Sequence, residues 1–229
     1  MQKPMNLACA VLLTLLAAAG GRAAGASSIF INEIHYDNAG ADVDEFIELA
    51  GPAAFDIEGW ALVLYNGVSG APYRTAMLSG RFEDQGDGFG ALGFALPGIQ
   101  NGAPDGMALV DEHAALVQLL SYEGQFTATA GPAAAVVSTP LPVAQTGLDA
   151  AGVSLQLLGN GTIAPDFVWS GPFLSSFGAL NVGQTVVRAA VPEPTSLALF
   201  GLALLALVGV RHFTSSPRHT SVAVGVAVG

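Results

Sequence analysis

The chain has 229 residues, of which 18 are acidic and 7 are Lys or Arg, so its formal net charge is −11. This acidity argues against a nucleic-acid partner, because phosphate binding requires a basic face. The single cysteine, Cys9, lies in an N-terminal apolar run, which excludes a disulfide framework and a thiolate metal site. About 165 residues remain between the two apolar ends, enough for one domain with a core.

Residues 1–26 are predicted to be a secretory signal peptide. Lys3 supplies the positive charge at its start, and residues 7–19 form the apolar stretch that follows. Ala24 and Ala26 provide the small residues of a cleavage site just before Ser27. The sequence after Ser27 is therefore expected to be exported.

The central part of the chain indicates an all-β domain. No stretch between Ser27 and Ala190 has a sustained helical period, and short apolar runs alternate with turn residues. The Ala-, Gly- and Pro-rich part over residues 127–146 is expected to be a loop, and the Gly159-Asn160-Gly161 sequence to separate the last two strands. Without a helix to cover a sheet face, two packed sheets are the simplest way to bury these strands. The expected strands are residues 28–36, 45–49, 59–66, 73–78, 92–96, 106–111, 116–122, 153–158 and 167–169.

Several of these segments resemble a known family. Residues 29–37, 44–49 and 59–62 look like the start of the lamin-tail domain, an immunoglobulin-like β-sandwich. Residues 98–106, 119–124 and 166–171 are similar to segments of its secreted bacterial versions. The resemblance implies a lamin-tail-like sandwich over residues 27–186. In bacteria such domains often accompany extracellular nucleases or phosphatases as non-catalytic modules, so it implies no activity of the domain itself.

Residues 195–211 are predicted to span a membrane. The run from Thr195 to Val210 has no charged residue, and a helix satisfies its own backbone polar groups in a bilayer. Two prolines in the linker over residues 187–194 give this helix a sharp start. Arg211 and Arg218 follow the helix, so the positive-inside rule places the tail over residues 212–229 in the cytoplasm. A buried core helix is the alternative.

The same stretch resembles the PEP-CTERM sorting signal of bacterial envelope proteins. The residues that carry the resemblance are Val191, Pro192, Glu193 and Pro194, then the apolar helix, then Arg211. In that family a membrane-embedded exosortase recognises the signal and cleaves near Pro-Glu-Pro. The resemblance therefore implies an exosortase as partner and passage through the inner membrane to the cell surface or the medium. The chain departs from the family pattern in its tail, which ends in an uncharged Val-, Ala- and Gly-rich repeat over residues 221–229.

Two acidic regions are candidates for a calcium site, because calcium prefers oxygen ligands. The first region holds Glu33, His35, Asp37, Asp42, Asp44, Glu45 and Glu48. The second is the Gly-rich loop with Glu83, Asp84 and Asp87. Neither has the ligand spacing of a known calcium loop. The competing interpretation is structural: Glu33 and Glu48 bond to edge or loop amides, and the aspartates form turns.

Catalysis has little support in the sequence. His35 and His113 are the two histidines before the predicted membrane helix, and neither lies in a nucleophile-elbow or zinc motif. Trp60, Trp169, Phe46 and Phe167 lie within apolar strand runs, which favours the core over a ligand platform. We therefore expect no enzyme and no cofactor other than a candidate calcium ion.

These observations predict an exported, non-catalytic β-sandwich with a structural or adhesive role at the cell surface or in the extracellular matrix. The PEP-CTERM resemblance implies an association with biofilm and extracellular polysaccharide. A calcium-dependent carbohydrate- or protein-binding module is the alternative function. A secreted hydrolase with an unrecognised site is a weaker one.

Overall fold

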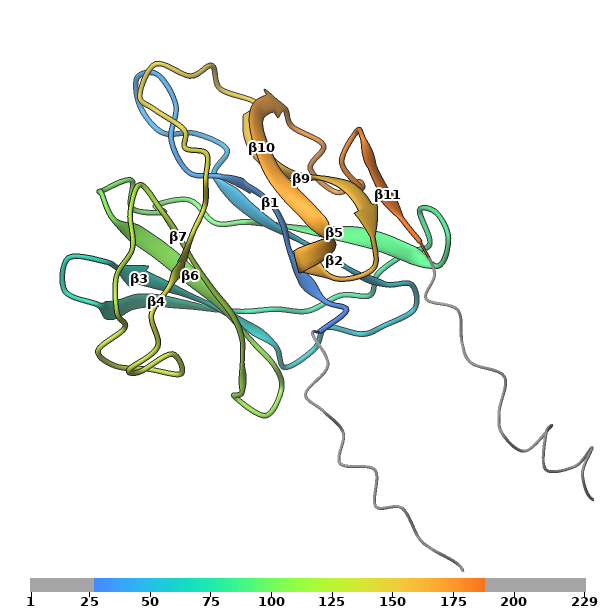
Figure 1. Ribbon diagram of the computed structural model, residues 1–229, viewed down its shortest axis with the longest axis horizontal. Coiled ribbons are helices and arrows are strands. Elements are labelled where there is room, and N and C mark those ends of the chain that lie inside the picture. The colour runs from blue at the N-terminus through green and yellow to red at the C-terminus, as the bar shows by residue number, and fades with distance from the viewer. Residues whose placement is uncertain (1–26, 188–229) are drawn as a thin grey trace, which may run out of the picture. The chain divides into compact units, whose positions relative to one another are not determined.

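The computed structural model describes residues 27–187, in which strands dominate (Figure 1). The predicted signal peptide with Ala24 and Ala26, and the chain from Arg188 to Gly229 with the Pro-Glu-Pro residues and Arg211, lie outside the described residues. Within residues 27–187, no helix is both long and apolar enough to cross a bilayer.

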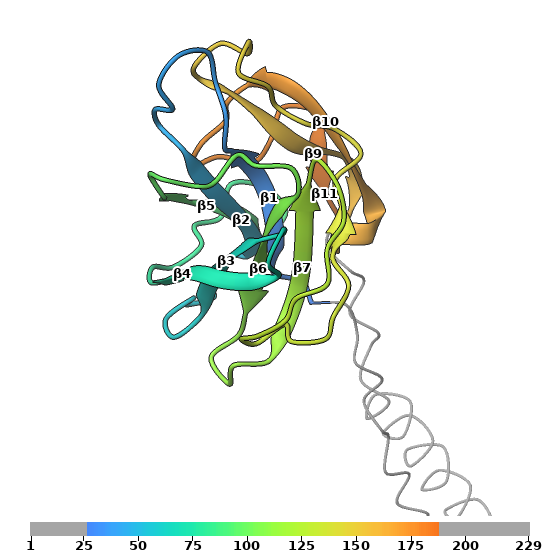
Figure 2. The ribbon, with the colours of Figure 1, turned by 90° about the vertical axis from the view of Figure 1, so that its left-hand side faces the viewer.

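The strands form two sheets that pack face to face, as Figure 2 shows from the side. The predicted all-β, two-sheet architecture is therefore confirmed. The first sheet has the order β10-β9-β1-β2-β5, with β11 beside β9, and its strands are β1 (Phe30–His35), β2 (Phe46–Pro52), β5 (Phe89–Ala95), β9 (Val153–Gly161), β10 (Phe167–Leu174) and β11 (Gln184–Val186). The second has the order β4-β3-β6-β7-β8, and its strands are β3 (Ala61–Asn66), β4 (Ala71–Met77), β6 (Asp105–Val110), β7 (Leu116–Tyr122) and β8 (Thr139–Pro140).

A β-bulge at Asn32 explains the imperfect alternation of the first strand. Ile31 pairs with Leu49 and Glu33 pairs with Glu48, so β1 uses one residue more than β2 over this step. The extra residue brings Ile31 and Ile34 to the same face, toward the core. Glu33 and Glu48 consequently lie opposite each other on the outer face of the first sheet.

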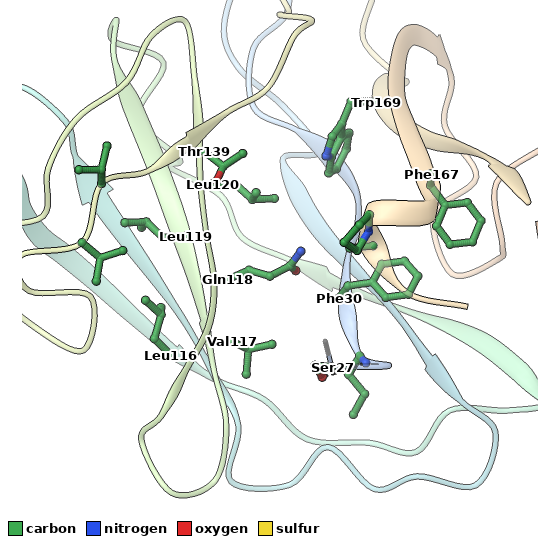
Figure 3. A pocket seen from close by; sticks show the side chains of 15 residues that line it. Ser27, Phe30, Leu116, Val117, Gln118, Leu119, Leu120, Thr139, Phe167 and Trp169 are labelled. Carbon is green, nitrogen blue, oxygen red and sulfur yellow. Dashed lines mark hydrogen bonds between the residues drawn. The ribbon is translucent and has the colours of Figure 1, made fainter. Parts of the chain in front are cut away.

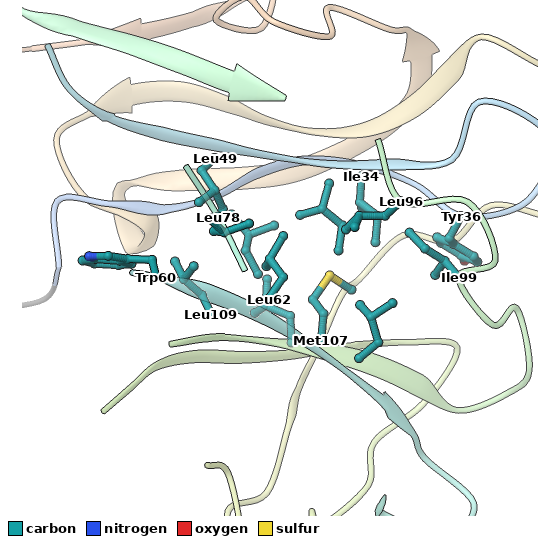
Figure 4. Close-up of a cluster of buried hydrophobic side chains, with 14 of the residues drawn as sticks. Ile34, Tyr36, Leu49, Trp60, Leu62, Leu78, Leu96, Ile99, Met107 and Leu109 are labelled. Atoms are coloured by element: carbon teal, nitrogen blue, oxygen red, sulfur yellow. The ribbon is translucent and has the colours of Figure 1, made fainter. Parts of the chain in front are cut away.

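The main core fills the space between the sheets (Figure 4). Ile34 and Leu49 of the first sheet face Leu62, Met107 and Leu109 of the second, and each is almost fully buried. Burial of each such aliphatic side chain is worth about 1.5–3 kcal/mol.

Of the four aromatic residues expected in the core, three are buried and one is not. Trp60, Phe46 and Phe167 are buried as predicted, whereas Trp169 is half-buried. Trp169 lies at the margin because its strand, β10, is an edge strand of the first sheet.

Several segments differ from the sequence prediction. The Gly159-Asn160-Gly161 sequence was expected to end a strand, but β9 continues through Gly161 because β11 pairs with this part of it. Gly161 is needed for space, since a Cβ there would lie 2.0 Å from the Cβ of Asp166 in the 3-10 turn η1 (Ala164–Asp166). The expected loop over residues 127–146 contains the short strand β8, and β5 begins at Phe89 rather than at residue 92.

The two ends of the described chain lie at the same end of the sandwich. Phe30 at the start of β1 and Val186 at the end of β11 belong to one buried cluster. The last described residue, Val187, accepts a hydrogen bond through its carbonyl from the Thr162 hydroxyl (2.9 Å). The loops over residues 36–45 and 96–104 therefore lie at the opposite end, remote from both points where the flanking segments join.

Candidate functional site

The acidic residues from Glu33 to Glu48, predicted to form one candidate calcium region, are divided among separate places. Glu33 and Glu48 are buried on the outer face of the first sheet. Asp37, Asp42 and Glu45 lie beyond the end of β1, in the loop that leads to β2. These carboxylates are close in the sequence. In the structure, however, Glu33 and Glu48 lie within β1 and β2, whereas the other three lie in the loop that joins these strands.

Asp37 and Asp42 share one amide donor. The Asn101 Nδ2 group donates to Asp37 Oδ1 (3.4 Å) and to Asp42 Oδ2 (3.1 Å). Burial raises the pKa of Asp37, and the neighbouring charge of Asp42 raises it further. These two carboxylates therefore repel each other across a neutral donor.

Glu45 is buried nearby and is only partly satisfied. Its Oε2 atom accepts the Gly98 amide (2.5 Å), while its Oε1 atom is buried with no hydrogen-bond partner among the described residues. Burial raises the pKa of Glu45, and Asp42 contributes in the same direction. Across residues 27–187, however, no three His, Cys, Asp or Glu side chains are grouped so that they could hold a metal ion.

The second calcium candidate, the loop with Glu83, Asp84 and Asp87, forms a turn. Its three carboxylates are exposed, and Asp84 Oδ1 accepts the amides of Gly86 (3.0 Å) and Gly88 (3.1 Å). An aspartate that bonds to amides two and four residues later stabilises a turn without any metal. This geometry gives no support to calcium binding here, which stays a prediction.

Neither histidine is placed for catalysis in the part of the chain that the structure describes. His35 is fully buried, its Nε2 atom lies 3.0 Å from the Val43 carbonyl, and its Nδ1 atom lies 2.9 Å from Gln145 Nε2. A carbonyl only accepts, so Nε2 carries the hydrogen and both ring nitrogens are occupied. His113 is exposed in the β6–β7 turn, 3.6 Å from Glu112. Neither ring bonds to a Ser or Thr hydroxyl in residues 27–187.

An apolar groove of about 590 Å³ opens along one side of the sandwich (Figure 3). Leu116 and Leu119 of β7 line one wall, and Phe167 and Trp169 of β10 line the other. Between the walls, Gln118 accepts the Ile31 amide through its Oε1 atom (2.8 Å). The groove exists because β1 pairs with β9 over two residues only, after which the two strands diverge.

The most highly organised polar site is the pair Glu33 and Glu48. Both side chains are fully buried, and the chain between β10 and β11, residues 175–183, lies over them; we call it the covering segment. Glu33 Oε1 accepts the Ser176 amide (2.9 Å), and Glu48 Oε2 accepts the Gly178 amide (2.6 Å). The interpretation that these glutamates bond to loop amides is confirmed.

The electrostatics of this pair are unusual. Burial, together with the charge of Glu33, raises the pKa of Glu48 to about 8. The one ion pair within residues 27–187 is that of His113 and Glu112, so no described Lys or Arg neutralises the buried carboxylates. Two like charges buried side by side are costly, so one of the two carboxyls is protonated at neutral pH.

Sequence reasoning missed the residues that complete this site. Asn181 Nδ2 donates to the carbonyls of Asn32 (3.1 Å) and Leu157 (2.9 Å), at the point where β1 and β9 diverge. Gln184 Nε2 donates to Asn32 Oδ1 (2.6 Å). These partners are 149 and 152 residues from Asn32 in the chain, so no local pattern could have shown them.

Comparison with known proteins assigns the C-terminal segment. Residues 190–211 match the family model of the PEP-CTERM protein-sorting motif, which contains all the residues predicted for the signal, Val191, Pro192, Glu193, Pro194 and Arg211. No curated protein and no solved structure matches the chain. The chain thus carries a PEP-CTERM motif after an all-β domain. The motif implies a protein that is exported, sorted at the membrane and processed by an exosortase for the cell surface.

Proposed function

We propose that this protein is a non-catalytic surface or matrix component with a structural or adhesive role, and that its sandwich is of the lamin-tail type. The single observation that carries the proposal is the sorting motif over residues 190–211, directly after the strand-rich domain. The lamin-tail assignment rests on the sequence segments around β1, β2 and β3, and the two-sheet architecture is compatible with it.

The arrangement of the domain fits delivery by a C-terminal signal. Ser27 lines the groove together with Ala164 and Pro165, and Val187 is bonded to Thr162, two residues before Ala164. Both flanking segments therefore join the sandwich at one end. The opposite end, with the loops over residues 36–45 and 96–104, is left available for contact with other matrix components such as extracellular polysaccharide.

The sorting step is tested by a substitution in the motif. We expect Glu193→Gln to reduce the processed form of the protein several-fold, because the exosortase reads the Pro-Glu-Pro residues. Glu112→Gln, which removes one exposed carboxylate from the β6–β7 turn, is the matched control and should leave processing unchanged. Immunoblots of membrane and surface fractions measure the ratio of the two forms, and equal processing in all three proteins would contradict the proposal.

A calcium-dependent binding module is the second candidate function. One observation favours it: Glu45 Oε1 is buried without a hydrogen-bond partner among residues 27–187, close to Asp37 and Asp42. A bound cation there would neutralise carboxylates that otherwise repel each other. Calorimetric titration with calcium tests this candidate, and an absence of heat together with an unchanged melting temperature would eliminate it.

A further inference from the structure

The covering segment, residues 175–183, is held on the first sheet mainly by polar contacts. Besides the two glutamates, Gln85 holds it from the β4–β5 loop: Gln85 Nε2 donates to the Gly178 carbonyl (2.8 Å), and Gln85 Oε1 accepts the Leu180 amide (2.9 Å). Two of its apolar side chains also contact the sheet: the half-exposed Phe177 ring lies 4.8 Å from that of Phe46, and the half-buried Leu180 packs against the cluster that contains Phe30. The attachment of this segment therefore depends on the hydrogen-bond network.

When both carboxyl groups are ionised, the network has one hydrogen too few to satisfy all its acceptors. The Ser176 hydroxyl lies 2.6 Å from Glu33 Oε2 and 2.8 Å from Asn181 Oδ1, yet it has one hydrogen to donate. Asn181 cannot be turned around, because its Nδ2 group donates to two carbonyls. A proton on Glu33 Oε2 resolves the conflict: Glu33 donates to Ser176, and Ser176 donates to Asn181.

We propose that Glu33 and Glu48 form a proton-dependent clasp, in which one shared proton keeps the covering segment closed over the first sheet and its loss opens the segment. With both carboxyls ionised, Ser176 cannot satisfy both of its acceptors. Two negative charges then also face each other on adjacent strands without a described cation nearby. Opening of the covering segment exposes both carboxylates to water and removes this conflict.

No other titratable group on the surrounding elements takes over this role. The side chains that face the pair from β9 are Ser154, which donates to Glu33 Oε1 (2.5 Å), and Gln156. The residue opposite Glu48 on β5 is Gly93. The next residue on the same face of β1 is His35, whose two nitrogens are already bonded to Gln145 and Val43.

The clasp also controls the last strand of the domain. β11 follows the covering segment directly, pairs with β9 over three residues, and is tied to Asn32 by Gln184. When the covering segment opens, β11 loses the anchor on its N-terminal side.

Hydrogen exchange of the full-length protein in detergent, with quench-flow labelling and detection by mass spectrometry, tests the clasp independently of sorting. We expect the protection factors of the Ser176 and Gly178 amides to fall about tenfold per pH unit above about pH 8, after correction for the intrinsic exchange rate. Peptides from β6 and β7 serve as the internal control and should keep their protection.

Glu33→Gln is the decisive variant, because its amide can donate to Ser176 as the protonated carboxyl does. It should keep the covering segment closed at every pH tested, while Glu58→Gln, which changes an exposed carboxyl, should behave like the unaltered protein. Should Glu33→Gln fail to fold, Glu48→Gln removes the charge that faces Glu33 and must at least shift the pH at which protection is lost. The clasp would be overturned by pH-independent protection of residues 175–183 in the unaltered protein, by an unchanged pH dependence in the Gln variant, or by loss of protection in β6 and β7 in parallel.

Discussion

The two carboxylate clusters of this domain differ in how their charges are compensated. At Glu33 and Glu48, six hydrogen bonds from side chains and amides converge on the two carboxyl groups. At Asp37, Asp42 and Glu45, one Asn101 amide serves two aspartates, and one oxygen of Glu45 has no partner in the described part of the chain. The first cluster is built into the sheet, whereas the second lies in a loop, so we expect substitutions in the first to have the larger effect on stability.

The largest expected effect is the pH dependence of stability. The folded chain retains a proton at the glutamate pair up to about pH 8, whereas an unfolded glutamate, with a pKa of 4.5, releases it earlier. Between these values the folded state binds more protons, so the free energy of unfolding falls as pH rises, by at most about 5 kcal/mol.

Urea denaturation at pH 5, 6, 7 and 8 measures this slope. Burial raises the pKa of Asp37, Glu45 and Asp105 as well, so these groups contribute a smaller slope of the same sign. Glu48→Gln should therefore flatten most of the pH dependence but not all of it. A stability that increases from pH 5 to pH 8 would contradict the assignment of a shared proton.

Removal of the Glu33 carboxyl altogether should be the next largest effect. Glu33→Ala leaves the Ser154 hydroxyl and the Ser176 amide buried without an acceptor, which costs about 3 kcal/mol. The matched control Glu58→Ala removes an exposed carboxyl and should change stability by less than about 0.5 kcal/mol. Chemical denaturation at pH 6 compares the two variants, and equal stabilities would show that the network is not structural.

The packing of the covering segment can be weakened without any change of charge. A Cβ at Gly93 would lie 2.3 Å from the Phe177 ring, so Gly93→Ala must displace this half-exposed side chain. We expect a loss of about 1–2 kcal/mol and faster hydrogen exchange in residues 175–183, since the ring can move outward. Unchanged exchange in that segment would mean that Phe177 does not hold it.

The smallest expected effect concerns the cluster of Asp37, Asp42 and Glu45. Asp42→Asn removes the repulsion between Asp42 and Asp37 near Asn101, and should raise the melting temperature slightly, by an amount equivalent to about 0.5 kcal/mol. A bound calcium ion would make the Asp42 carboxylate stabilising, so Asp42→Asn would then lower the melting temperature instead of raising it. Thermal denaturation with chelator and with calcium separates the two cases.

The sequence predicts those parts of the structure in which the interacting residues are close together along the chain. The strands around Glu48, Trp60 and Leu109 were predictable because their apolar periodicity is local. The bulge at Asn32 was visible as an irregular pattern, although its structural meaning was not. β11 could not be predicted, since its three residues form a strand only by pairing with β9.

The same limit applies to the site. That Glu33 and Glu48 would bond to amides was predictable from their position among apolar strand residues. Their partners Ser176 and Gly178 are 143 and 130 residues away and lie in a segment without regular structure. The sorting motif shows the opposite case: its signal is contiguous, so the sequence alone was sufficient to find it.

The most direct test of the central claim is the intact mass of the mature protein isolated from the cell surface or the medium. We predict a chain that begins at Ser27 and ends close to Pro194, as cleavage of both the signal peptide and the sorting motif requires. A mature protein that still carries the residues after Arg211 would contradict it, because the chain would then remain anchored and unprocessed.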